Sequence, residues 1–328
     1  MYCDTEPQED VTTLYAVPDD PDSSVVESDQ LPWDLGHSVM NHVAIDEVTG
    51  LLLKLRNPTN REEAFQRLIA IKDVMPYSDI LGPQIVNSSG ILSILVEEIT
   101  SIYPFTTNVD QSPIVFHRAL YSILLLQAVA QNTVTNLFAI QHRFPFLGFP
   151  FIRYTGKDAA ILQLKEESLW LIAYSTQNID DTAHRCLIDN EIMKVCQKVL
   201  EESIAETFLP AIISIYSMLL FDSIQQFKLF TSETSMIITL MEQINHFLKE
   251  MGEVKTETEN RCIEYIVRLI ETLMEHVVFH EPIKKALGSS ESRYGSNIIR
   301  LYEQPDIAER FSDTRFLVMT SFQKTEQT

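Results

Sequence analysis

Several groups of side chains in this sequence have types and spacings that could support chemistry. His276 and His280 lie four residues apart, so on a helix they would share one face, as two zinc ligands do. No glutamate follows His276 in the arrangement of a helical metalloprotease motif, and the sequence offers no evident third ligand. We therefore expect a structural role for both histidines, and we predict no bound metal and no cofactor.

A cysteine–histidine pair is the second candidate. His184 and Cys186 are near Cys196 in sequence, and a histidine beside a thiol could activate it as a nucleophile. Cys196, however, shares an apolar helix face with Ile192 and Val199. This placement favours packing in the core over catalysis.

Two pairs of neighbouring carboxylates, Glu97-Glu98 and Glu166-Glu167, could suggest acid–base chemistry. Neighbours on a helix point about 100° apart, so they do not face each other as a general acid and base must. We expect both pairs on solvated helix faces. With only nine glycines and no glycine-rich phosphate loop, the sequence carries no enzymatic signature.

An aromatic cluster could stack nucleic-acid bases, and it consists of Phe144, Phe146, Phe149 and Phe151. Its basic neighbours are only Arg143 and Arg153, which is few for a phosphate backbone. Packing between helical repeats is therefore the favoured interpretation, and base stacking is the alternative.

The elements that position these residues are expected to be helices. Low glycine content and many Leu, Ile, Glu and Gln residues favour helix, and no alternating strand pattern is present. The helix Pro113–Ala130 contains too few polar residues to cover one face, so we expect it to be buried nearly all round. Helices of ~10–20 residues recur in groups of about 40–45 residues, a period typical of armadillo-like arrays. The pattern predicts an all-α helical solenoid.

The charge of the chain is concentrated at its start. Residues 1–50 contain twelve acidic residues and no lysine or arginine, within a total net charge of -21. We predict a disordered acidic tail over residues 1–42, a helical domain over 43–322 and a flexible C-terminus over 323–328. Trp33 lies in a small apolar island of the tail, which either folds loosely onto the domain or docks a partner.

Charge and composition also bear on location and partners. An acidic surface repels phosphate backbones, so nonspecific nucleic-acid binding is disfavoured. The first residues do not form a secretory signal, and no apolar run reaches the ~18 residues of a membrane span. Four cysteines without a CxxC pair are most simply reduced thiols. We expect a cytoplasmic protein, with the nucleus as a further location.

Three blocks of the central region carry a family resemblance: GILSILVEEITSIYP, LLLQAVAQ and PFLGFPFI. Their order and spacing resemble the Required-for-cell-differentiation (Rcd) family, and the similarity covers roughly Val43–Ser321. The resemblance implies an armadillo-repeat domain of roughly six repeats, acting as a non-catalytic adaptor subunit of the CCR–NOT mRNA deadenylation complex in mRNA decay and translational repression. It implies the NOT scaffold subunit and repressor proteins as partners and leaves a homodimer open. A module that binds single-stranded nucleic acid is the alternative function.

The resemblance also implies where the NOT scaffold would bind. In the family, apolar and aromatic residues on the stretch that corresponds to Asn87–Thr100 contact the scaffold. The matching positions here are small or polar: Asn87, Ser89, Ser93 and Thr100. Because buried apolar area contributes ~25 cal/mol per Å², these exchanges should weaken the contact.

A second implied site is degenerate. Similar proteins hold the indoles of repressor segments in pockets lined by a tyrosine and two arginines, and the matching positions here are Ser232, Thr234 and either Pro282 or Ile283. No Tyr or Arg occurs between Phe221 and Asn260, and a lysine does not reproduce the stacking of a planar guanidinium. We expect the tryptophan pocket to be lost, unless another wall such as Phe227 or Phe230 rebuilds it.

Overall fold

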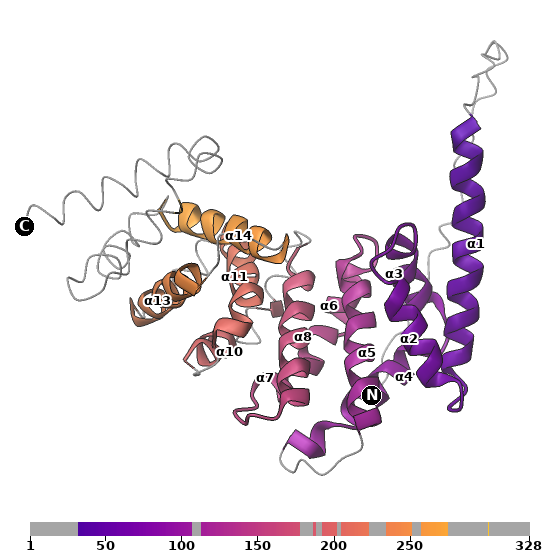
Figure 1. Ribbon diagram of the computed structural model, residues 1–328, viewed down its shortest axis with the longest axis horizontal. Coiled ribbons are helices and arrows are strands. Elements are labelled where there is room, and N and C mark those ends of the chain that lie inside the picture. The colour runs from indigo at the N-terminus through magenta and orange to yellow at the C-terminus, as the bar shows by residue number, and fades with distance from the viewer. Residues whose placement is uncertain are drawn as a thin grey trace, which may run out of the picture. The chain divides into compact units, whose positions relative to one another are not determined.

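The computed structural model describes residues 32–106, 113–177, 186–187, 192–201, 205–222, 234–250, 257–274 and 301. Every regular element among these residues is an α-helix or a 3-10 helix, and this confirms the predicted all-α class (Figure 1). The chain divides into a short unit, residues 1–40, and a large unit, residues 41–328.

The first helix differs from the prediction in its starting point. Helix α1 spans Pro32–Leu55 and so begins before Val43, inside the stretch that we expected to be disordered. Proline is favoured in the first helical turn because its missing N–H has no intrahelical partner there. The rest of the predicted tail, residues 1–31, lies outside the described residues, as do residues 323–328.

Helix α1 is followed by a break at Asn57-Pro58, because proline disfavours the helical conformation in the residue before it. Helix α1 ends at Leu55, and the Asn57 carboxamide oxygen accepts a hydrogen bond from the Thr59 backbone N–H at 3.1 Å. Asn60 occupies the N-cap position of the next helix, but its side chain makes no capping hydrogen bond. The helices on this side of the chain are α2 (Arg61–Ile71), α3 (Tyr77–Asn87), α4 (Ile91–Thr100), η1 (Tyr103–Thr106) and α5 (Pro113–Gln131).

The later helices are of two kinds, long ones within the predicted ~10–20 residues and shorter ones of four to nine residues. The N-terminus of α8 is capped by Asp158, whose carboxylate accepts hydrogen bonds from the backbone N–H groups of Ala160 and Ile161 at 3.0 and 3.1 Å. The helices here are α6 (Asn136–Gln141), η2 (Phe144–Gly148), α7 (Phe149–Ile152), α8 (Ala159–Ser175), α10 (Ile192–Leu200), α11 (Ala205–Asp222), α13 (Thr234–Glu250) and α14 (Glu257–Met274).

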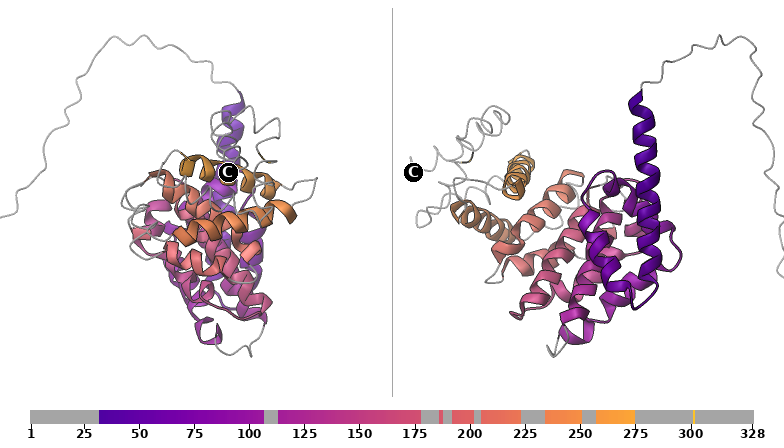
Figure 2. Two further views of the ribbon diagram at one scale, coloured as in Figure 1. Left: turned by 90° about the vertical axis from the view of Figure 1, so that its left-hand side faces the viewer. Right: turned by 45° about the vertical axis from the view of Figure 1, so that its right-hand side comes forward.

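The helices of the large unit stack in layers that follow chain order. Helices α3 and α4 pack on α5, while η2 and α7 pack on α8. The long helices then contact one another in sequence, α5 against α8, α8 against α11 and α11 against α14 (Figures 1 and 2). This nearest-neighbour stacking defines a helical repeat solenoid.

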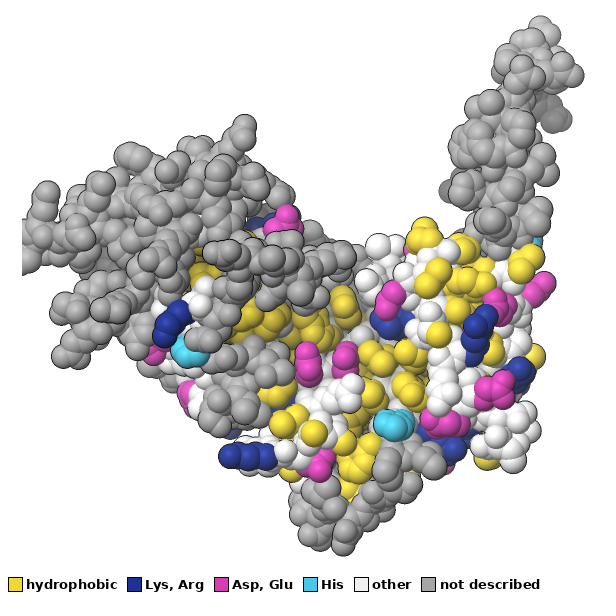
Figure 3. Space-filling model, viewed as in Figure 1, with side chains coloured by type: hydrophobic (Ala, Val, Ile, Leu, Met, Phe, Trp, Pro, Cys, Tyr) yellow, Lys and Arg dark blue, Asp and Glu magenta, His cyan; other side chains and the backbone are white. Residues whose placement is uncertain are grey.

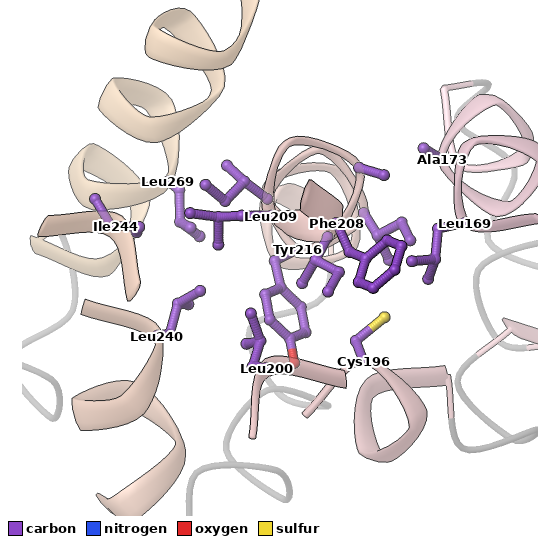
Figure 4. Close-up of a cluster of buried hydrophobic side chains, with 14 of the residues drawn as sticks. Leu169, Ala173, Cys196, Leu200, Phe208, Leu209, Tyr216, Leu240, Ile244 and Leu269 are labelled. Carbon is purple, nitrogen blue, oxygen red and sulfur yellow. The ribbon is translucent and has the colours of Figure 1, made fainter. Parts of the chain in front are cut away.

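Buried side chains form two clusters that meet at α8. The N-terminal cluster joins α1–α5 to residues of α8 such as Leu164 and Leu171. The C-terminal cluster contains Leu169 and Ala173 of α8 together with α10, α11, α13 and α14, and Figure 4 shows part of it around Tyr216. Because one helix contributes to both clusters, the core continues from layer to layer.

The predicted burial of the central helix is confirmed from Ala119 onward, whereas His117 near its start is exposed. From Ala119 to Ala130 only Tyr121 and Leu124 are half-buried, and the other side chains are buried. The polar residue Gln127 is 2% exposed and donates hydrogen bonds from its Nε2 to the Glu167 backbone carbonyl and carboxylate at 2.8 and 2.7 Å. Ser112, which directly precedes this helix, lies outside the described residues.

The phenylalanine cluster packs between the two clusters of the core, as expected. Phe151 is fully buried in the N-terminal cluster, whereas Phe146 and Phe149 pack against the C-terminal one. The rings of Phe146 and Phe149 meet edge to face at 5.3 Å. The cluster therefore holds adjacent layers together.

No single helix in the described part of the chain is both long and apolar enough to cross a membrane. One bent pair, Tyr77–Asn87 with Ile91–Thr106, meets the length and composition criteria together, with an angle of 91° between its parts.

Candidate protein-binding surfaces

The first candidate surface lies on α4 and on the turn that precedes it. Asn87, Ser89 and Ser93 are exposed, and Thr100 is half-buried. Ser93 lies seven residues before Thr100, so these two positions lie on one side of α4, and Ser89 lies in the turn just before the helix. We call this stripe, with Asn87 beside it, the α4 surface.

Three features fix the orientation of the α4 surface. On its inner side, Glu98 is 8% exposed and accepts an ion-paired hydrogen bond from Arg61 of α2, with 2.7 Å between Nη1 and Oε1. The turn before α4 uses Gly90 with φ 78°, a left-handed conformation that favours glycine. Core residues such as Leu95 and Ile99 hold the same inner side in the N-terminal cluster. The α4 surface therefore faces away from the packed layers.

Val96 lies at the inner edge of the α4 surface, where it packs against the N-terminal cluster, and it is not among the residues that the sequence indicated. It lies three residues after Ser93 and four before Thr100, and its side chain is half-buried. The Thr100 hydroxyl donates a hydrogen bond to the Val96 backbone carbonyl at 2.9 Å, so the hydroxyl already has a hydrogen-bond acceptor within the helix. Helical spacing alone could have indicated Val96, because residues three or four positions apart on a helix lie on the same face.

The second candidate surface is a groove of about 790 Å³ between the long helices. It is lined by the C-terminal end of α2 and by α5, α8 and α14. Three aromatic residues contribute to its wall, namely Trp170, Tyr174 and Tyr265. Figure 3 shows acidic side chains beside hydrophobic ones over α8 on this face of the molecule. We call this feature the α5–α8 groove.

The carboxylates of Glu166 and Glu167 lie in this groove, and the prediction that they are solvated is wrong. Both side chains are half-buried, and burial raises the pKa of each carboxyl above its usual value. The neighbouring charge of Glu167 raises the pKa of Glu166 further, whereas the hydrogen bond from Gln127 opposes the shift at Glu167. The prediction fails for Glu98 too, and Glu97 alone among these four residues is exposed.

The other candidate catalytic and metal-ligating residues do not form a site in the part of the chain that the structure describes. Cys196 is fully buried, and burial raises the pKa of its thiol to about 12. The thiol is therefore unreactive, and the side chain packs in the core as expected. No group of three or more metal-ligating side chains occurs in the described ranges. His276, His280, His184, Ser232, Pro282 and Ile283 lie outside the described residues, and Thr234 is known only as the first residue of α13.

Comparison with known proteins agrees with this architecture. The family model "Cell differentiation family, Rcd1-like" matches residues 51–291. The chain is 27% identical to Protein CAF40 of Saccharomyces cerevisiae over 192 residues, which cover 58% of this chain and 50% of that protein. It is 24% identical to Cell differentiation protein rcd1 of Schizosaccharomyces pombe over 150 residues, covering 46% of this chain and 52% of the relative. The chain thus spans about half the length of the curated relatives it matches.

The stacked layers and the continuous core define a helical repeat protein of the armadillo-like class. Because the family model covers most of the chain, the protein belongs to the Rcd1-like cell differentiation family.

Proposed function

We propose that this protein is a non-catalytic adaptor subunit of the CCR–NOT mRNA deadenylation complex. It would act in mRNA decay and translational repression through protein–protein binding, in the cytoplasm and also in the nucleus. The observation that carries the proposal is the family match over residues 51–291, which includes every residue of the α4 surface. The stacked helices support it because a solenoid presents long surfaces to partners while it keeps a continuous core.

The α4 surface is the proposed contact with the NOT scaffold. The exposed residues of the α4 surface are small and polar, and its apolar residue, Val96, is half-buried. Buried apolar area contributes about 25 cal/mol per Å², so an interface of this composition gains less from burial than an aromatic one. We therefore expect a complex with a dissociation constant in the micromolar range, about 8 kcal/mol of binding free energy.

Affinity purification of the full chain from cells tests the proposal. Mass spectrometry should identify the scaffold and the deadenylase subunits together with the protein, because a docked adaptor is retained through the scaffold. A tagged Gln141→Tyr variant, which adds bulk at an exposed residue of α6, should recover the same proteins. Purification that repeatedly yields no subunit of the complex would remove the adaptor role.

We also propose that the chain does not hold tryptophan-bearing repressor segments as its relatives do. The positions that match the tyrosine and the arginines carry Ser232, Thr234 and either Pro282 or Ile283. Each lost stacking contact should reduce affinity on the order of tenfold. Titration with a tryptophan-bearing peptide should therefore show much weaker binding than a family member that retains the arginines. Equal affinity in the two proteins would show that a wall such as Phe227 rebuilds the pocket.

A further inference from the structure

The α5–α8 groove combines negative charge with aromatic surface. Four carboxylates line it, those of Asp73, Glu166, Glu167 and Glu264, against the single amine of Lys72. The Lys72 amine lies 2.7 Å from the Asp73 carboxylate, so its charge is already paired. The electrostatic potential in the groove therefore favours a cation from outside.

The carboxylate of Glu166 is the group in the groove that would gain most from contact with such a cation. This carboxylate is half-buried beside the charge of Glu167, and both burial and this neighbour raise its pKa. Among the described residues no donor makes a hydrogen bond to the Glu166 carboxylate, whereas the Glu167 carboxylate accepts one from Gln127 at 2.7 Å. An incoming cation would offset both the lost hydration and the repulsion between the two carboxylates.

The aromatic wall is continuous with these carboxylates along α8. Trp170 lies four residues after Glu166, and Tyr174 lies four residues after Trp170, so the three share one face of the helix. The rings of Trp170 and Tyr174 stack at 5.8 Å with 29° between their planes. Both are half-buried, which leaves part of the ring surface open to the groove. A π surface next to a carboxylate suits a cation that is both planar and charged.

Arginine fits this arrangement better than lysine. Its guanidinium stacks on an aromatic face and donates two parallel hydrogen bonds to a carboxylate, while an ammonium is compact and strongly hydrated. A volume of about 790 Å³ is also large enough for several side chains of a peptide. A phosphate-bearing ligand is disfavoured, because four carboxylates would repel it.

We propose that the α5–α8 groove binds an arginine-bearing peptide segment of a partner protein, with a guanidinium on Trp170 and the carboxylates of Glu166 and Glu167. The groove is formed by the ends and faces of α2, α5, α8 and α14, so it is separate from the α4 surface. The inference goes beyond docking to the NOT scaffold and does not depend on it.

Fluorescence anisotropy with the full-length protein tests the proposal. The probe is a short fluorescein-labelled peptide of alternating arginine and serine, with lysine and glutamine versions as matched controls. The arginine peptide should bind most tightly, the lysine version several-fold more weakly and the glutamine version not measurably. Binding should also weaken as salt is raised, because the contact is partly electrostatic. Equal binding of the arginine and glutamine peptides would overturn the proposal.

Substitutions in the groove test whether the arginine peptide binds there. Glu166→Gln keeps the shape of the side chain and removes its charge, and Trp170→Phe keeps a ring with a weaker π surface. Each should reduce affinity for the arginine peptide several-fold, and together on the order of tenfold. Glu97→Gln, at an exposed residue of α4, removes the same charge elsewhere and should leave affinity unchanged.

Two further outcomes separate this inference from others. If Glu166→Gln and Trp170→Phe leave peptide affinity unchanged while thermal unfolding matches the parent protein, the groove is not the site. If labelled single-stranded RNA binds and is displaced by the peptide, the groove takes nucleic acid and the proposal is wrong. Co-purification with the scaffold should be unaffected by both variants, so failure at the groove is distinguishable from failure of the adaptor role.

Discussion

Replacing Leu125 with alanine should lower the free energy of unfolding by about 2–5 kcal/mol. Leu125 is fully buried in the N-terminal cluster on α5, the helix that contacts α2, α3, α4 and α8. Removing three carbons from such a site loses their transfer free energy and leaves a cavity that packed neighbours fill only partly. The effect should be large because several layers meet at this helix.

Urea unfolding followed by circular dichroism measures the change. Leu53→Ala serves as the control, because the same three carbons are removed from a leucine that is 55% exposed on α1. That variant should stay within about 0.5 kcal/mol of the parent protein. A loss below this value for Leu125→Ala would mean that α5 is not the central buried helix.

Gly148→Ala should also destabilise the protein, by about 1–3 kcal/mol or more. A Cβ at Gly148 would lie 2.3 Å from the Cβ of Ser168 and 2.5 Å from its Oγ, well inside van der Waals contact. Ser168 is fully buried, and its hydroxyl donates to the Leu164 carbonyl at 2.6 Å. Neither side can move freely, so the added methyl should push η2 away from α8.

A double variant and a control identify the cause. Ser168→Gly removes the clashing atoms and leaves the Ser168 Cα at 3.2 Å as the nearest neighbour, so it should recover part of the loss. Gly50→Ala provides the control, because a Cβ there meets nothing within 4 Å and alanine favours the helix by about 1 kcal/mol. If the double variant is no more stable than Gly148→Ala alone, close approach between η2 and α8 is not the cause.

Local patterns in the sequence were sufficient for the helices and for much of the core. The apolar run of α5 predicted its burial, and the proline after Asn57 is a local helix-breaking signal next to the end of α1. The apolar face that carries Cys196 likewise predicted packing in the C-terminal cluster. These features depend on residues a few positions apart, which is the range over which helical periodicity carries information.

Features that depend on contacts between distant segments were not predictable in the same way. Glu166 and Glu167 were expected on a solvated face because neighbouring carboxylates on a helix point apart, but α2, α5 and α14 enclose them in a groove. The glycine at position 148 is explained by Ser168, twenty residues later in the chain. The start of α1 was misplaced for another reason, since charge and composition favoured disorder while proline favoured a helical start.

Direct binding between the purified chain and the purified central region of the NOT scaffold tests the adaptor role most closely. Isothermal titration calorimetry should give a one-to-one complex with a micromolar dissociation constant. Ser93→Tyr, which adds bulk in the middle of the α4 surface, should abolish measurable heat, whereas Gln141→Tyr should bind like the parent protein. Absence of binding at micromolar concentrations, or equal binding by the Ser93→Tyr variant, would contradict docking through the α4 surface.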